Sequence, residues 1–333
     1  MLLNECLRDK KSERNISIDL LKCFAIFLIT NSHMEMLYEK YSFLATGGSI
    51  GNALFFFCSG FTLFLKPMES LQQFPNWYKR RINRIYPTLI AVAILASVFF
   101  DTHWDMRDII FAKWYWFVSC IMTYYVAIFF VGLYFKDRIL PIGILVALGS
   151  AVLFSYAYKT PGFNMYDDYK IRWLLFFNYM LLGAKMGTLV NDIKSKPVVD
   201  ACLLLLSIVC FYVLYIVGLR IRNVAFLQFF SFIPLLCAVY YFYKIGASHW
   251  AERLYKNKTG KFFIRFVGGV SLEIYMIQYF LLTDKMNDLF PLNILIMFVI
   301  IVFVAYLTRC LARLISQTFK ETPYEWRRII ELY

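Results

Sequence analysis

Charged residues are scarce in this chain. Only 17% of its 333 residues are Asp, Glu, Lys or Arg, whereas 60% are hydrophobic and the mean hydropathy is +0.59. A soluble globule of this size needs more polar surface than this composition supplies, so a soluble protein is excluded and the surrounding medium must be largely lipid. The 34 Phe and 24 Tyr fit that conclusion, because membrane helices place such rings in lipid contact and at the interface.

Several other features are missing. There is no Pro- or Ser-rich linker and no low-complexity tract, so we expect one membrane domain without an appended soluble enzyme. None of the eight cysteines has CxxC spacing, and most lie in apolar segments, which favours packing residues over metal ligands or disulfides. We also expect no cleaved signal peptide, because the first apolar stretch is a full span that follows a charged tail.

Long apolar stretches recur along the whole chain. Each is close to the roughly 20 residues that a helix needs to cross a bilayer. They lie at about 18–37, 48–65, 85–100, 115–135, 139–157, 171–190, 199–219, 224–244, 266–283 and 292–315. The sequence therefore predicts an all-α, polytopic integral membrane bundle of about ten transmembrane helices.

The formal net charge of +13 gives this bundle a direction. If the N-terminus is cytoplasmic, most of the 35 Lys and Arg fall on the cytoplasmic side, as the positive-inside rule requires. The main contributors are Arg8, Lys10, Lys11 and Arg14, the run 79–81, the loop 244–265 and the tail 309–328. The basic character is thus mainly topology, and we expect no nucleic-acid partner. The predicted organisation is a cytoplasmic tail at 1–17, a membrane domain at 18–316 and a cytoplasmic tail at 317–333.

The first span carries two ionisable side chains. Lys22 and His33 are 11 residues apart, close to three helical turns, which puts them on one face about 16 Å apart along the axis. Ionisable residues inside spans are costly and are functional candidates. The simpler alternative is that Lys22 snorkels to the headgroups while His33 hydrogen-bonds a neighbouring helix.

Two further segments follow. Span 2 contains FFFCSGF at 55–61, where Ser59 and Gly60 permit close helix approach, so packing explains this segment well. KRRINRIYP at 79–87 precedes span 3, and in a helix Arg81 and Arg84 share a face on which guanidinium groups can bind phosphate oxygens. An ordinary cluster that contacts lipid headgroups would look the same.

Taken together and in this order, these three segments resemble the acyltransferase-3 family of membrane acyltransferases, whose members carry a basic-x10-His motif, an FxSGY/F segment and an RxxR motif. The segment 114–117, Trp-Tyr-Trp-Phe, is similar to the family's WF segment, and 271–278 is similar to its S-x-x-I-Y-x-x-H stretch. One departure is Gln278, which stands where many members have His. Because Gln cannot take a proton near neutral pH, any acid/base role there would pass to His33.

The resemblance implies transfer of an acyl group, commonly acetyl from acetyl-CoA, to a hydroxyl of a surface glycan or lipid-linked sugar in the bacterial cytoplasmic membrane. Acetyl-CoA would be the donor, without a metal, and the other partners would be the saccharide acceptor, membrane lipids and a possible second copy of the chain. We expect catalytic roles for His33, as general base or as a transient acyl carrier, and for Glu35. We also expect cofactor contacts from Lys22, Ser59, Arg81 and Arg84, and substrate contacts from Trp116, Tyr275 and Gln278. A transporter of glycan intermediates is the alternative, and acetyl and succinyl donors stay open.

The outer segment 101–108, followed by Trp114 and Trp116, carries rings and carboxylates that could grip a sugar. An aromatic belt at the membrane interface explains the same rings and is preferred.

Overall fold

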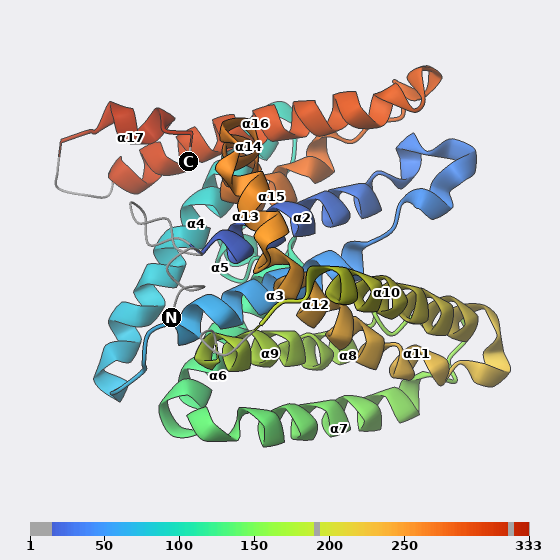
Figure 1. Ribbon diagram of the computed structural model, residues 1–333. Helices are drawn as coiled ribbons and strands as arrows, with labels where there is room; N and C mark the ends of the chain where they lie inside the picture. The colour runs from blue at the N-terminus through green and yellow to red at the C-terminus, as the bar shows by residue number, and fades with distance from the viewer. Residues whose placement is uncertain (1–14, 190–193, 319–322, 333) are drawn as a thin grey trace. The chain divides into compact units, whose positions relative to one another are not determined.

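The computed structural model describes residues 15–189, 194–318 and 323–332. These residues form helices and connecting turns without a β-strand, which agrees with the predicted all-α class (Figure 1). The N-terminal cations Arg8, Lys10, Lys11 and Arg14 lie outside the described residues, as do parts of both predicted tails.

The chain divides into two compact units. The described part of the first comprises 15–22, 52–69, 127–189 and 194–261, and that of the second comprises 23–51, 70–126, 262–318 and 323–332. Helices α2 (Ile16–His33), α3 (Gly48–Phe64), α6 (Trp116–Tyr134) and α14 (Lys258–Gly269) each contribute residues to both units.

The remaining helices of the first unit follow one another in the chain. They are η4 (Lys136–Arg138), α7 (Ile139–Ala157), α8 (Tyr169–Leu175), α9 (Phe177–Thr188), α10 (Pro197–Arg220), η5 (Arg222–Val224), α11 (Leu227–Phe230), α12 (Phe232–Gly246) and α13 (His249–Lys256). Helix α7 packs along α8 and α9, and α12 packs against α10 and α9 (Figure 1).

Glycines set the closest helix approach in the first unit. A Cβ atom on Gly60 of α3 would overlap the carbonyl oxygen of Met180 on α9, and one on Gly183 of α9 would overlap that of Phe57 on α3. The two backbones therefore touch directly, as small residues allow in membrane helices. This confirms the packing interpretation of the FFFCSGF segment for Gly60.

The second unit contains the other helices. They are η1 (Glu35–Leu37), η2 (Glu39–Leu44), η3 (Leu71–Gln73), α4 (Phe74–Phe99), α5 (Met106–Ile110), α15 (Ser271–Leu281), η6 (Asn287–Leu289), α16 (Leu292–Thr318) and α17 (Trp326–Ile330). Helices α4, α15 and α16 pack against one another. Helix α4 begins well before the predicted span 85–100 and takes the whole basic segment into its first turns.

Eight stretches of the described residues are long and apolar enough to cross a membrane. They are Ile16–His33, Glu39–Phe64, Leu71–Phe99, Trp116–Tyr134, Lys136–Ala157, Pro197–Arg220, Leu227–Gly246 and Leu292–Thr318. The other two predicted spans are interrupted helices: 171–190 divides into α8 and α9, and 266–283 divides at Val270 into α14 and α15. The second break follows Gly268 and Gly269, which have low helix propensity. Ten spans therefore remain a prediction.

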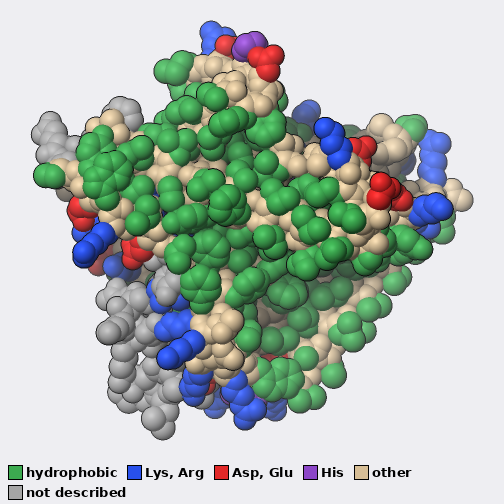
Figure 2. All heavy atoms as spheres, turned by 90° about the horizontal axis from the view of Figure 1, so that it is seen from above, with side chains coloured by type: hydrophobic (Ala, Val, Ile, Leu, Met, Phe, Trp, Pro, Cys, Tyr) green, Lys and Arg blue, Asp and Glu red, His purple; other side chains and the backbone are tan. Residues whose placement is uncertain are grey.

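The exposed surface of the long helices is apolar. On α7, Leu145 is 69% exposed, and on α16 Leu295 is 61% exposed. Hydrophobic side chains cover most of the face in Figure 2, with Lys and Arg toward its edges. A monomeric soluble protein rarely shows such a surface, so these helices face lipid.

Candidate functional site

His33 ends α2 and contacts Tyr279 of α15, both within the second unit. The Tyr279 hydroxyl lies 2.9 Å from His33 Nε2, and the ring centroids are 4.7 Å apart with a 60° tilt. The bond occupies Nε2 and leaves Nδ1 as the other ring nitrogen. The hydroxyl can donate or accept, so either imidazole tautomer satisfies this contact, and Nδ1 then takes the role opposite to that of Nε2.

An aromatic cluster holds Tyr279 in place. Its ring centroid is 6.0 Å from that of Tyr115 and 6.1 Å from that of Tyr275, and Phe117 lies 5.5 Å from Tyr275. The Tyr115 hydroxyl donates a 2.8 Å hydrogen bond to the carbonyl oxygen of Met276, which ties the start of α6 to α15. The Trp-Tyr-Trp-Phe segment thus reaches the site through its second and fourth residues.

Three predicted substrate-binding residues lie in or beside this cluster. Tyr275 belongs to it, and Gln278 is fully buried, with its Nε2 donating to the Tyr275 carbonyl oxygen at 3.3 Å. Trp116 packs on Phe117, with centroids 6.2 Å apart. Their substrate contacts stay predictions.

Glu35 is not brought to the imidazole. It begins η1 after a non-helical Met34, and its side chain is exposed. Among the described residues, no hydrogen bond to the His33 ring comes from Glu35, whereas one forms with Tyr279. Its catalytic role stays a prediction without a contact to support it.

The basic segment is helical, as the shared face of Arg81 and Arg84 requires. The Arg81 guanidinium carbon lies 4.5 Å from the ring centroid of Trp77, one turn earlier on α4. Trp77 is itself buried and meets Tyr125 edge-on at 6.1 Å. Cation–π contact holds Arg81 at the helix surface, and Arg84, on the same face, is exposed.

A buried carboxylate lies near this segment. Glu273, on the first turn of α15, is 7% exposed and accepts a 3.0 Å hydrogen bond from Thr88 Oγ1 on α4. The charges of Arg309 on α16 and Arg84 on α4 act on it. A carboxylate at this depth is costly to ionise, because an unpaired buried charge is costly.

Helix α15 links these two groups of residues. Glu273 at its start accepts a hydrogen bond from Thr88 of α4, and Tyr279 near its end contacts His33. Six residues separate them, so the two levels are about 9 Å apart along the helix axis. Helix α15 therefore contacts both α4, which carries the two arginines, and His33 of α2.

Lys22 and Ser59 belong to the first unit. Lys22 and Asp19 on α2 lie near enough to the Cys58 thiol on α3 to act on it electrostatically, so Lys22 lies beside the FFFCSGF segment. Ser59 is half-buried, and its carbonyl oxygen accepts from Thr62 Oγ1 at 3.1 Å. Their predicted cofactor contacts stay predictions.

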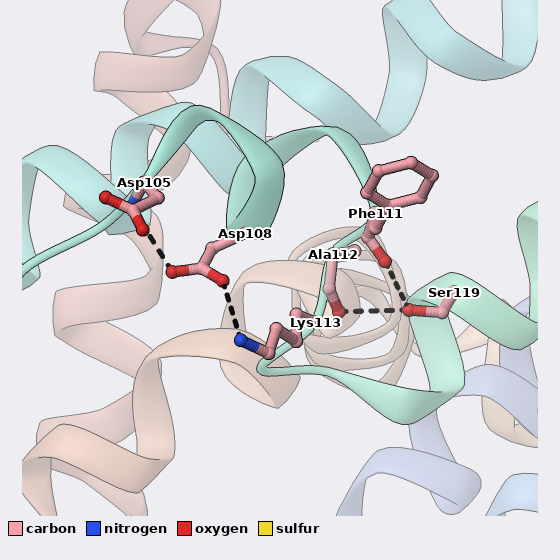
Figure 3. Close-up of polar contacts among 6 residues, drawn as sticks. All are labelled: Asp105, Asp108, Phe111, Ala112, Lys113 and Ser119. Atoms are coloured by element: carbon pink, nitrogen blue, oxygen red, sulfur yellow. Dashed lines mark hydrogen bonds and ion pairs between the residues drawn. The ribbon is translucent and has the colours of Figure 1, made fainter.

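The segment 101–115 of the second unit is a capped loop (Figure 3). The Asp105 backbone N–H donates to the Asp108 carboxylate at 3.2 Å, and Lys113 pairs with it at 3.4 Å. Together with the Trp114 indole, these groups lower the pKa of Asp108, the Asp105 backbone donor having the largest effect. Ser119 Oγ donates toward the carbonyl oxygens of Phe111 and Ala112 at 2.6 and 3.0 Å and closes the loop onto α6.

The seven described cysteines, from Cys23 to Cys310, are free thiols. Within the described ranges, no group of three or more His, Cys, Asp and Glu comes together as metal ligands would.

Sequence reasoning missed Tyr279 and Glu273. Glu273 could have been found as an ionisable residue inside a predicted span. Tyr279 carries no such signal, because it is one of 24 tyrosines in an aromatic-rich chain.

The long apolar helices, the half-buried His33 and the buried Glu273 define a multi-pass membrane protein with ionisable groups among its helices. The chain belongs to the acyltransferase-3 family: the family model, described as an acyltransferase domain, matches residues 15–310. It is therefore a membrane acyltransferase. No curated protein and no solved structure matches the chain significantly.

Proposed function

We propose that this acyltransferase moves an acetyl group from cytosolic acetyl-CoA to a hydroxyl of a surface glycan or lipid-linked sugar in the bacterial cytoplasmic membrane. The observation that carries the proposal is the contact between Tyr279 on α15 and His33 at the end of α2, in a chain of the acyltransferase-3 family.

Arg81 and Arg84 hold the donor. Guanidinium groups bind phosphate oxygens in pairs, and the phosphates of CoA match two arginines one turn apart on α4. Arg81 is already oriented by Trp77, so little side-chain freedom is lost on binding.

His33 is the general base. The acceptor hydroxyl oxygen attacks the thioester carbonyl carbon while a His33 ring nitrogen takes the hydroxyl proton. The carbon–sulfur bond then breaks, and the imidazolium returns the proton to the CoA sulfur. With Nε2 bound to Tyr279, Nδ1 is the nitrogen that performs both transfers when Nε2–H donates to the tyrosine oxygen.

The predicted topology supports this division of labour. With a cytoplasmic N-terminus, the first turns of α4 lie on the cytoplasmic side and the end of α2 lies in the outer half of the membrane. The donor would enter from the cytosol and the acceptor from outside, with the pantetheine arm of CoA bridging between them.

Comparative glycan mass spectrometry tests this proposal in cells with the wild-type gene, without it, and with His33→Ala. The expected result is an added acetyl mass only with the wild-type gene, with the variant protein present at normal level in the membrane. Transfer that persists at the wild-type level in His33→Ala would show that another group is the base. A glycan that lacks acetylation in all strains, but is exported only with the gene, would indicate transport instead.

A further inference from the structure

The first unit contains an apolar groove between α7, α9 and α12, with a volume of about 240 Å³. Its walls are mainly aliphatic, with Phe232 of α12 at one side. Leu140 and Ile144 on α7 line it and are 68% and 54% exposed, so the groove opens on the lipid-facing surface. The site does not depend on the proposed acyl transfer.

The groove is suited to a hydrocarbon chain. It is larger than the roughly 150 Å³ apolar cavity that stays dry and takes up benzene. Asn178 and Lys185 on α9 line it seven residues apart, so it runs about 10 Å along the helix. The Asn178 amide donates to the Leu175 carbonyl oxygen, so this polar group is satisfied internally.

Lys185 marks one end of the groove. A Cβ on Gly149 of α7 would lie 3.2 Å from Leu174, whereas one on Gly143 would lie 3.5 Å from Asn178. Leu174 is on α8 and Asn178 on α9, so the chain through α8 and α9 runs opposite to α7, which places Lys185 near the first turn of α7.

Positive charge gathers at this end. Lys185 is half-buried, and no carboxylate of the described residues forms an ion pair with it. Lys136 and Arg138 of η4 are exposed directly before α7, with an exposed Asp137 between them. An acyl chain in the groove would thus carry its headgroup to a cationic end.

We propose that this groove binds an anionic phospholipid, with one acyl chain between α7, α9 and α12 and the headgroup phosphate at Lys185. Lipid tails are as apolar as the groove, so burial of the chain gives little selectivity among lipids. Selectivity comes from charge, and one Lys near an anionic headgroup contributes about a fivefold preference, equivalent to about 1 kcal/mol.

Native mass spectrometry of the full chain tests the proposal, with phosphatidylglycerol and phosphatidylcholine of identical acyl chains offered in equal amounts. The wild type should retain phosphatidylglycerol about fivefold better. Lys185→Gln should lower that preference, whereas Lys185→Arg should keep it. Lys159→Gln is the matched control, because Lys159 is an exposed cation beyond the other end of α7.

Gly143→Leu tests the groove itself, because Gly143 lines it and a Cβ there would meet only the side chains of Asn178 and Leu181, at 3.5 and 4.0 Å. Both lipids should then be lost. Ala147→Leu serves the same purpose if Gly143→Leu does not give a monodisperse protein.

Equal retention of both lipids by the wild type would overturn the proposal, as would a preference that Lys185→Gln leaves unchanged or adducts that survive the filling variant. Binding of an added polyprenyl phosphate in place of phosphatidylglycerol would also overturn it.

Discussion

Tyr279→Phe isolates one hydrogen bond at the proposed base. The substitution removes the hydroxyl that lies 2.9 Å from His33 Nε2 and keeps the ring that packs at 4.7 Å. A neutral hydrogen bond contributes about 0.5–1.5 kcal/mol net, and 1.36 kcal/mol corresponds to tenfold in rate. We therefore expect the transfer rate to fall about two- to tenfold, with KM for acetyl-CoA unchanged.

His33→Ala should have the larger effect, because loss of a general base lowers the rate about 10²–10⁴-fold. Initial rates of labelled acetyl transfer in membranes, normalised to protein level, compare the variants. Tyr156→Phe is the matched control, since Tyr156 is 82% exposed on α7 and should behave as wild type. The reasoning fails if Tyr279→Phe keeps the full rate, or if it is as inactive as His33→Ala in a folded protein.

Three further outcomes follow from the structure. Arg81→Ala with Arg84→Ala should weaken acetyl-CoA binding and reduce its salt dependence in titration calorimetry, and an unchanged affinity would remove their phosphate role. Gly183→Ala should lower the thermal midpoint by steric overlap, whereas Gly143→Ala, whose added methyl meets ordinary contacts, should not. The pKa of Asp108 is lowered from its ordinary value of 3.8, so the ionised carboxylate stabilises the capped loop at pH values above 3.8. This stabilisation is lost as the pH falls through the lowered pKa. The tryptophan fluorescence of the wild type should therefore be steady from pH 8 to about 5 and change only below about pH 4. Asp108→Asn should show the altered signal already at neutral pH. Identical pH profiles of wild type and variant would contradict this.

The sequence predicts the membrane helices well, because long apolar stretches have few alternatives to a helix in lipid. It predicts the interrupted stretches 171–190 and 266–283 less well, since apolar composition alone does not reveal a break such as that at Val270. Spacing placed Arg81 and Arg84 on one face correctly, because i, i+3 neighbours are a local property of a helix.

The partners of these residues were harder to foresee. The contact between His33 and Tyr279 joins residues 246 positions apart, and that between Thr88 and Glu273 joins residues 185 apart. No local periodicity encodes such pairs, which depend on how α2, α4 and α15 pack. Conversely, closeness in sequence does not ensure a contact: Glu35 is two residues from His33 but is exposed in the structure.

The glycine contacts between α3 and α9 also bear on motion. Each backbone there lies against the other at Gly60 and Gly183, and Gly187 makes a third close approach to the Phe61 carbonyl oxygen. Such interlocked surfaces resist sliding, because a shift of even one residue would drive a larger side chain into a neighbouring carbonyl group. Any rearrangement that accompanies turnover must therefore carry these two helices together as one rigid body.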